Sequence, residues 1–181
     1  SFNGSPPIDV LIYCQALDLA SFAQDYVSGV RVVTPVTYGV PAKPDPGKTG
    51  KGREKVWELR TDEQGYVTEC TGANFMFVRQ DRIKLPDRSK VLPGISMETV
   101  LELAESLGIA VEEGNYNTYD VYTADEAFVT STSFCICPVS SVNGSGIGEG
   151  NVPGPVTDRL QKAYSGLVGI DIVGQYLARL G

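Results

Sequence analysis

The alternation of apolar and polar residues is clearest over residues 65–78, which read GYVTECTGANFMFV. Val67 and Glu69 fall on one face of a period-two pattern, and the residues between them fall on the other, which predicts a strand. Gly72 interrupts this pattern, and an apolar strand over 75–78 follows it. We therefore expect Glu69 at a strand end beside a small-residue corner, where side chains from several elements can converge.

Short apolar or β-branched runs predict the remaining strands. They lie at 9–17, 30–36, 56–59, 82–85, 128–133 and 134–139. Gln80-Asp81 is expected to turn the chain between 75–78 and 82–85. Asn143-Gly144 is typical of a two-residue hairpin turn.

A helix is predicted over 97–107, where apolar residues recur every three or four positions. Ser96 is expected to cap its start, and Gly108 is expected to end it. Residues 111–120 are expected to form a polar connection. Further helices are expected at 156–168 and 172–180, with a short helical or turn segment at 21–26. Residues 1–181 are expected to form a single strand-rich domain with three helices.

Composition narrows the possible functions of this 181-residue chain. It carries 15 Lys and Arg against 22 Asp and Glu, so the net charge is 15 − 22 = −7. An acidic chain without a basic run argues against binding to nucleic acid. No apolar run approaches the roughly 20 residues that a membrane span requires. The polar, Pro-rich start is unlike a signal peptide, and we expect a cytoplasmic protein.

Cysteine and histidine usage removes several kinds of catalytic and metal site. The sequence has no His, which excludes Ser-His triads and metal sites with His ligands. The Cys135-x-Cys137 spacing does not fit a C-x-x-C metal or redox site. We expect no metal, and we expect reduced, buried thiols. Cys135 and Cys137 are expected to share one face of a strand.

Residues 38–55 are rich in Pro, Gly and basic residues, which predicts a mobile loop. The run Gly-Lys-Thr-Gly-Lys over 47–51 does not match the G-x-x-x-x-G-K-[ST] pattern of a nucleotide-binding loop. Neither composition nor periodicity assigns a function to this segment.

The string GYVTECTGANF over 65–75 resembles the signature of the fold-type IV aminotransferases that depend on pyridoxal phosphate (PLP). This family includes branched-chain and D-amino-acid aminotransferases and aminodeoxychorismate lyase. The resemblance extends from about Tyr26 to the C-terminus. It implies a mixed α/β fold, the larger C-terminal domain of a D-amino-acid aminotransferase-like enzyme. In that family the residue matching Glu69 bonds the pyridine nitrogen and keeps it protonated, so that the ring accepts electrons.

The same resemblance implies a site for the cofactor phosphate. The segment Pro-Gly-Ile-Ser over 93–96 matches one whose backbone N–H groups hold the phosphate, which implicates Ile95 and Ser96. Ser96 replaces the usual Thr, and Met97 replaces a common Arg. A helix start favours anions because its N–H groups are free and its dipole end is positive. The hydroxyl-rich segment after 124–128 matches a second phosphate loop, with Thr132 as the binding hydroxyl and Ser131 beside it.

The family lysine that binds the cofactor covalently lies after the strand matching 30–36. Lys48, which follows Asp45-Pro46-Gly47, occupies this place, and Lys51 is an alternative. The family has a helix between this lysine and the next strand, but this chain reaches the strand at 56–59 too early for one. Either a segment near Gly50 is absent from this sequence, or the protein has lost it.

The implied function is transfer of an amino group between a branched-chain or similar amino acid and a 2-oxo acid, by a homodimer that uses PLP. A smaller domain that completes the substrate pocket is expected before the matched region. Two alternatives stay open. One is a lyase similar to aminodeoxychorismate lyase, and the other is a degenerate or truncated homologue that binds the cofactor or assembles without catalysis.

Overall fold

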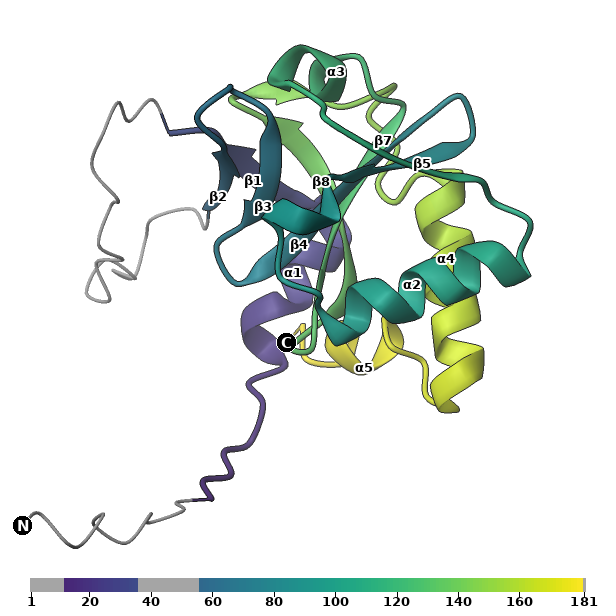
Figure 1. The fold of residues 1–181 in the computed structure, drawn as a ribbon. Helices are drawn as coiled ribbons and strands as arrows, with labels where there is room; N and C mark the ends of the chain where they lie inside the picture. The colour runs from purple at the N-terminus through teal and green to yellow at the C-terminus, as the bar shows by residue number, and fades with distance from the viewer. Residues whose placement is uncertain (1–11, 36–55, 181) are drawn as a thin grey trace, which may run out of the picture.

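The computed structural model describes residues 12–35 and 56–180, which are drawn in colour in Figure 1. The predicted loop over 38–55, with Lys48 and Lys51, lies outside these residues. The described strands are β1 (Val30–Val33), β2 (Val56–Thr61), β3 (Val67–Cys70), β4 (Ala73–Arg79), β5 (Arg82–Pro86), β6 (Val111–Gly114), β7 (Glu126–Ser131), β8 (Cys135–Val142) and β9 (Ser145–Gly146). The helices are α1 (Ala20–Ser28), α2 (Ile95–Ser106), α3 (Thr118–Tyr122), α4 (Pro155–Val168), α5 (Gly174–Leu177) and the 3-10 helix η1 (Arg88–Lys90).

The strands form a sheet that closes on itself. Its order is β3-β2-β1-β8-β7-β4-β5-β6, and β3 also pairs with β4. The strands β3, β2, β1, β8, β7 and β4 therefore make a closed ring, which leaves β5, β6 and β9 as extensions. β1 runs parallel to β2 and β8, whereas β4 runs antiparallel to β3, β5 and β7.

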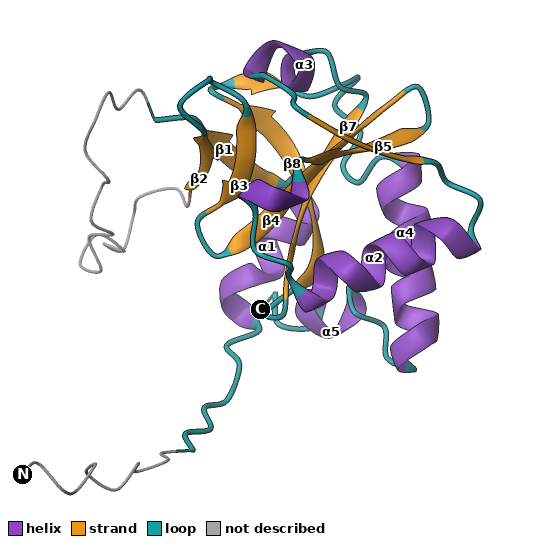
Figure 2. Cartoon of the chain, in the orientation of Figure 1, coloured by secondary structure: helices purple, strands orange, loops and turns teal. Residues whose placement is uncertain are grey.

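Strand β4 separates two hydrophobic clusters. Phe75 and Phe77 belong to the first cluster, which also contains residues of α1 and α5. Met76 and Val78 belong to the second, which is covered by α2 and α4. Figure 2 shows α2 and α4 together on one side of the strands. Because both faces of β4 are buried, residues 73–78 form an apolar run with little polar alternation.

The predicted hairpin turns are confirmed. Gln80 and Asp81 both have positive φ angles, of 54° and 57°, between β4 and β5. Asn143 and Gly144 have φ angles of 51° and 82° between β8 and β9. Two consecutive residues with positive φ match the twist of the flanking strands, which is why such sequences form tight hairpins.

The predicted helix over 97–107 is present, but its start differs. α2 begins at Ile95 with Gly94 as N-cap, and Ser96 is buried in the first turn. The prediction that Ser96 caps the helix is wrong, because Gly94 already adopts the extended cap conformation and its carbonyl accepts the first helical bond, from Glu98 N–H. Gly108 ends the helix as predicted, with a φ of 67°.

Three segments differ from their predicted structure, and the first is the final helix, which is predicted over 172–180, whereas α5 spans only Gly174–Leu177. Residues 12–17 form no strand, and their side chains are exposed. An apolar run forms a strand only where an adjacent strand provides backbone hydrogen bonds, and no described strand pairs with this segment. The predicted polar connection over 111–120 instead contains β6, which pairs parallel with β5, and α3, which Asn117 and Asp120 cap reciprocally. The sequence did not predict β6 because it is a partly exposed edge strand whose polar side chains give no apolar pattern.

Irregular backbone in β3 and β8 also changes which side chains share a face of each strand. Val67 and Cys70 pack in the same cluster, because the pairing of β2 with β3 shifts register. Cys135 has a φ of 57° and packs against the second cluster, whereas Cys137 lies in the first, so the two thiols do not share a face. All four cysteines are free, but Cys14 is exposed and Cys135 is half-buried, so burial of every thiol was a wrong prediction.

No helix in the described ranges is long and apolar enough to cross a bilayer. The same part of the chain contains no cluster of three Cys, Asp or Glu side chains arranged to hold a metal ion.

Glu126 joins the sheet to α4 through a buried carboxylate. It accepts hydrogen bonds from Val156 N–H at 2.7 Å, from Thr157 N–H at 2.8 Å and from the Thr157 hydroxyl at 2.7 Å. A Cβ on Gly154 would lie 2.2 Å from the Glu126 Cδ atom, so this approach requires glycine. The carboxylate occupies the N-terminus of α4 and is stabilised by the helix dipole.

We predict that Glu126→Ala lowers the free energy of unfolding by about 3 kcal/mol, because buried N–H groups lose a charged acceptor. Urea denaturation measures this change. Glu149→Ala is the matched control, since Glu149 is exposed. Equal stability of the Glu126→Ala variant and the wild type would contradict the structural role of this carboxylate.

Candidate functional site

Glu69 joins the β3–β4 corner to the segment that precedes α2. Its Oε2 atom accepts hydrogen bonds from Leu92 N–H at 2.9 Å and from Asn74 Nδ2 at 3.2 Å. Asn74 Nδ2 also donates to Leu92 O at 2.8 Å. Glu69 and Asn74 are direct partners in the β3–β4 ladder. The three residues form a closed hydrogen-bonded unit that fixes the carboxylate against the approach to α2.

Gly94 allows the same unit to reach the start of α2. A Cβ at this position would lie 2.2 Å from Asn74 Oδ1, so any side chain would displace the amide. The first helical bond is donated by Glu98, which leaves the N–H groups of Ile95, Ser96 and Met97 ahead of the intrahelical ladder. These groups and the positive end of a 12-residue helix form an electropositive edge near Glu69.

Thr130 extends the site onto a third strand. Asn74 on β4 pairs with Glu69 on β3 and with Thr130 on β7, so the three residues lie in one row across the sheet. The Thr130 hydroxyl is buried and has no hydrogen-bond partner among the described residues. Leaving such a group unpaired costs about 1–3 kcal/mol, which identifies this point as one where a polar ligand would be stabilised.

The turn between β7 and β8 continues from Thr130. Phe134 N–H donates to Ser131 O at 3.3 Å, and Ser133 N–H donates to the Ser131 hydroxyl at 3.3 Å. The Ser131 side chain is therefore engaged within its own turn. Thr132 is exposed, and in the described part of the chain its hydroxyl has no hydrogen-bond partner.

The structure places the predicted site residues in three groups. Glu69 and the helix start at Ile95–Ser96 are brought together through Leu92. Thr132 lies two residues after Thr130, the β7 residue that is in the same row as Glu69. Lys48 lies outside the described residues, and so does the alternative Lys51.

Asn74 and Thr130 belong to the same arrangement, although sequence reasoning assigned them no role. Each is a buried polar residue that follows an apolar run or interrupts one in its strand. A polar residue in such a strand is the signal that could have drawn attention to both, but their alignment with Glu69 depends on the strand register.

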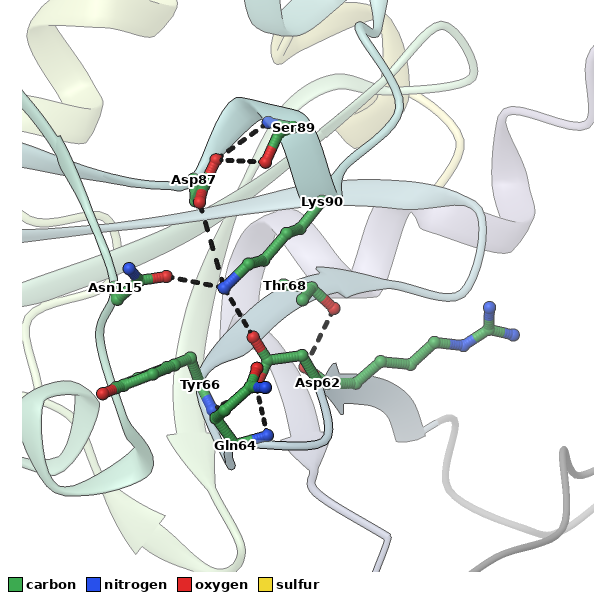
Figure 3. Close-up of polar contacts among 9 residues, drawn as sticks. Asp62, Gln64, Tyr66, Thr68, Asp87, Ser89, Lys90 and Asn115 are labelled. Atoms are coloured by element: carbon green, nitrogen blue, oxygen red, sulfur yellow. Dashed lines mark hydrogen bonds and ion pairs between the residues drawn. The ribbon is translucent and has the colours of Figure 1, made fainter.

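Lys90 connects the β2–β3 hairpin to the segment that carries Leu92 (Figure 3). Its ammonium group donates to Asp62 Oδ2 at 2.7 Å and to Asn115 Oδ1 at 2.8 Å, and it lies 3.9 Å from Asp87 Oδ2. It also lies 5.3 Å from the centre of the Tyr66 ring. Since Lys90 is two residues before Leu92, this network supports the backbone that binds Glu69.

The network shifts the pKa of its charged groups. Burial raises the pKa of Asp62, but hydrogen bonds from Lys90 and from backbone N–H groups outweigh it, so the pKa lies below its usual range. The hydrogen bond to Asp62 raises the pKa of Lys90 despite partial desolvation of the amine. Both residues are therefore charged across the neutral range.

The sequence pattern of the family described as "Amino-transferase class IV" matches residues 52–142, which is half of the chain. The chain belongs to the class IV aminotransferase family. The matched region contains Glu69, Ile95, Ser96, Ser131 and Thr132, and it begins after Lys48.

Part of the chain is similar in sequence to branched-chain-amino-acid aminotransferases. The branched-chain-amino-acid aminotransferase of Escherichia coli K12 is 41% identical over 110 residues, which are 60% of this chain and 35% of that protein. Branched-chain-amino-acid aminotransferase-like protein 2 of Arabidopsis thaliana is 41% identical over 109 residues, which are 60% of this chain and 19% of that protein. This class IV chain thus matches about a third or less of the length of these relatives.

Solved structures of aminotransferases confirm the predicted mixed α/β fold. The branched-chain amino acid aminotransferase of Escherichia coli has a TM-score of 0.64 and 30% identity, over 77% of this chain and 51% of that one. An aminotransferase from Brucella abortus bound to PLP has a TM-score of 0.57 and 26% identity, over 62% of this chain and 39% of that one.

A separate cavity of about 420 Å³ lies between α1, α4 and α5 of this class IV chain. Tyr26, Asp158, Gln161 and Asp171 are among its lining residues, and none of the predicted cofactor residues lines it. Because this cavity does not include Glu69 or the start of α2, we define the candidate site by the hydrogen bonds of Glu69 and by the start of α2.

We predict that Asp62→Asn lowers the melting temperature at pH 7 and that the difference shrinks as the pH falls below about 4. The folded pKa of Asp62 is depressed, so its contribution is present above the unfolded value, about 3.9, and is lost as the pH falls through the folded value. Calorimetry across this pH range measures the effect. Glu63→Gln is the control, because Glu63 is an exposed neighbour. A difference independent of pH would contradict the ion pair.

Proposed function

We propose that this chain is the larger, PLP-binding domain of a class IV aminotransferase. By this proposal it transfers an amino group between a branched-chain or similar amino acid and a 2-oxo acid, as a homodimer. The observation that carries the proposal is the closed unit of Glu69, Asn74 and Leu92, because it holds a carboxylate beside the open N-terminus of α2.

The donors and acceptors of this site fit the two ends of PLP. Glu69 uses Oε2 for both of its hydrogen bonds, which leaves Oε1 without a partner among the described residues and able to accept from a pyridine N–H. The N–H groups at the start of α2 and the exposed Thr132 hydroxyl suit a phosphate. The buried Thr130 hydroxyl lies in the same row as Glu69 and offers a further polar contact.

Each residue has a defined role in this proposal. PLP supplies a ring that accepts electrons from the substrate α-carbon. Glu69 holds the proton on the ring nitrogen, and Leu92 N–H and Asn74 hold the carboxylate in orientation. The N–H groups of Ile95 and Ser96 bind the phosphate together with Thr132, and Ser131 shapes the turn that presents it.

Lys48 is proposed to bind PLP covalently and to move the proton at the substrate α-carbon, with Lys51 as the alternative. An amine in this role must be available unprotonated. The proposed substrates are drawn from the names of the relatives, which are branched-chain-amino-acid aminotransferases. A lyase would use the same cofactor contacts.

A second candidate function is binding of PLP without catalysis, or assembly. One observation favours it: the family match begins at residue 52, after Lys48. Such a chain would retain Glu69 and the phosphate contacts but lack a placed amine.

We predict that Thr132→Val weakens PLP binding by roughly 1–3 kcal/mol, the cost of a lost hydrogen bond to a charged group. Titration followed by absorbance or intrinsic fluorescence measures the dissociation constant. Thr61→Val is the control, since Thr61 is an exposed strand residue on β2. Unchanged affinity of the Thr132→Val variant would remove Thr132 from the site.

Reduction with borohydride after addition of PLP, followed by peptide mass mapping, identifies the covalent lysine. We expect the pyridoxyl label on Lys48, with loss of the label in Lys48→Arg and retention in Lys51→Arg. The reverse result would assign the role to Lys51. A chain that binds PLP but carries no label at residues 43–55 would support the non-catalytic function.

A further inference from the structure

Two tyrosine hydroxyls bind the backbone of the turn that presents Thr132. The Tyr26 hydroxyl on α1 donates to the carbonyl of Phe134, and the Tyr176 hydroxyl on α5 donates to the carbonyl of Ser133. The two acceptors are consecutive residues at the end of the β7–β8 turn. Helices from opposite ends of the described chain therefore converge on the backbone of one predicted phosphate loop.

Aromatic packing fixes the two tyrosines and the turn as one body. The ring centres of Tyr26 and Tyr176 lie 4.9 Å apart, and Phe22 packs against Phe134 at 5.4 Å and against Tyr176 at 6.3 Å. The exposed fractions of Tyr26, Phe134 and Tyr176 are 4%, 1% and 1%. The Phe134 side chain thus anchors the turn in the core, while its carbonyl is bound from α1.

The backbone after the turn requires such support. Cys135, which follows Phe134, has a φ of 57°, a conformation that costs energy in residues other than glycine. The hydrogen bonds to the two carbonyls that precede Cys135, together with the buried Phe134 ring, hold it there. Without the two hydroxyls, the carbonyls of Ser133 and Phe134 would lose their buried donors.

Both phenols are donors at neutral pH. Burial raises the pKa of Tyr26 well above its usual range, and the nearby Cys137 thiol adds to the effect. Burial likewise raises the pKa of Tyr176 to about 12. Neither hydroxyl loses its proton under physiological conditions, so both bonds persist.

We propose that Tyr26 and Tyr176 are positioning residues for the phosphate end of the cofactor. They hold the Ser131–Phe134 turn so that the Thr132 hydroxyl is preorganised to bind a phosphate. Preorganisation raises affinity because the turn is ordered before the ligand arrives. This inference rests on the proposed PLP function, and it assigns a role to helices α1 and α5, which carry none of the predicted cofactor residues.

The test compares binding of PLP with binding of pyridoxal, which lacks the phosphate. We expect Tyr26→Phe and Tyr176→Phe each to reduce PLP affinity about 3- to 10-fold, the range for one hydrogen bond, while pyridoxal affinity stays unchanged. Tyr116→Phe is the matched control, because the Tyr116 hydroxyl donates to a backbone carbonyl, Glu112 O, away from the turn. Its ratio of PLP to pyridoxal affinity should equal that of the wild type.

A double-mutant cycle separates positioning from stability. If Tyr176 acts through Thr132, Tyr176→Phe should have no further effect on PLP affinity in the Thr132→Val background. Melting temperatures taken alongside show that each variant is folded. A variant that melts earlier but keeps the wild-type affinity ratio overturns the inference, and so do additive losses in the cycle. A wild-type chain that binds PLP no better than pyridoxal overturns the phosphate site itself, and with it the proposed function.

Discussion

Strand β4 is the constraint on which the rest of the structure depends. One of its edges is shared by β3 and β5, its other edge is bound along its length by β7, and both of its faces are buried. A strand in this position cannot shift register without exposing one cluster and disrupting the other. Asn74 at its beginning is held by the same ladder, so the position of Glu69 against α2 follows from the packing of Phe75 to Val78.

The two long helices on the second cluster use their N-termini differently. The start of α4 is occupied from within, because the Glu126 carboxylate accepts from its N–H groups. Among the described residues, no carboxylate accepts from the first N–H groups of α2, and Glu69 binds the backbone of Leu92, three residues before Ile95. The charge that stabilises α4 is thus part of the fold, whereas the first N–H groups of α2 donate to no carboxylate from within the described residues. This contrast explains why the candidate anion site lies at α2.

Support for this site comes from elements that do not form it. Lys90 and Asp62 hold the approach to α2 on one side, and Tyr26 and Tyr176 hold the β7–β8 turn on another. The supporting groups are drawn from the β2–β3 hairpin, η1, α1 and α5. A site assembled in this way depends on the complete fold, so under the proposed function we expect substitutions in these supports to weaken ligand binding.

Local sequence alone determined the turns at 80–81 and 143–144, the helices α2 and α4, the apolar strand β4 and the family motif around Glu69. Each of these depends on short-range rules: backbone angles that Asn and Gly tolerate, apolar periodicity, and residues that end a helix. The tertiary structure decided which residues meet. Three arrangements join residues from different parts of the chain. They are the row of Glu69, Asn74 and Thr130, the close approach of Asn74 to Gly94, and the tyrosine hydrogen bonds to the β7–β8 turn. Such contacts depend on strand register and on the closure of the ring, and neither is encoded in the periodicity of a single segment.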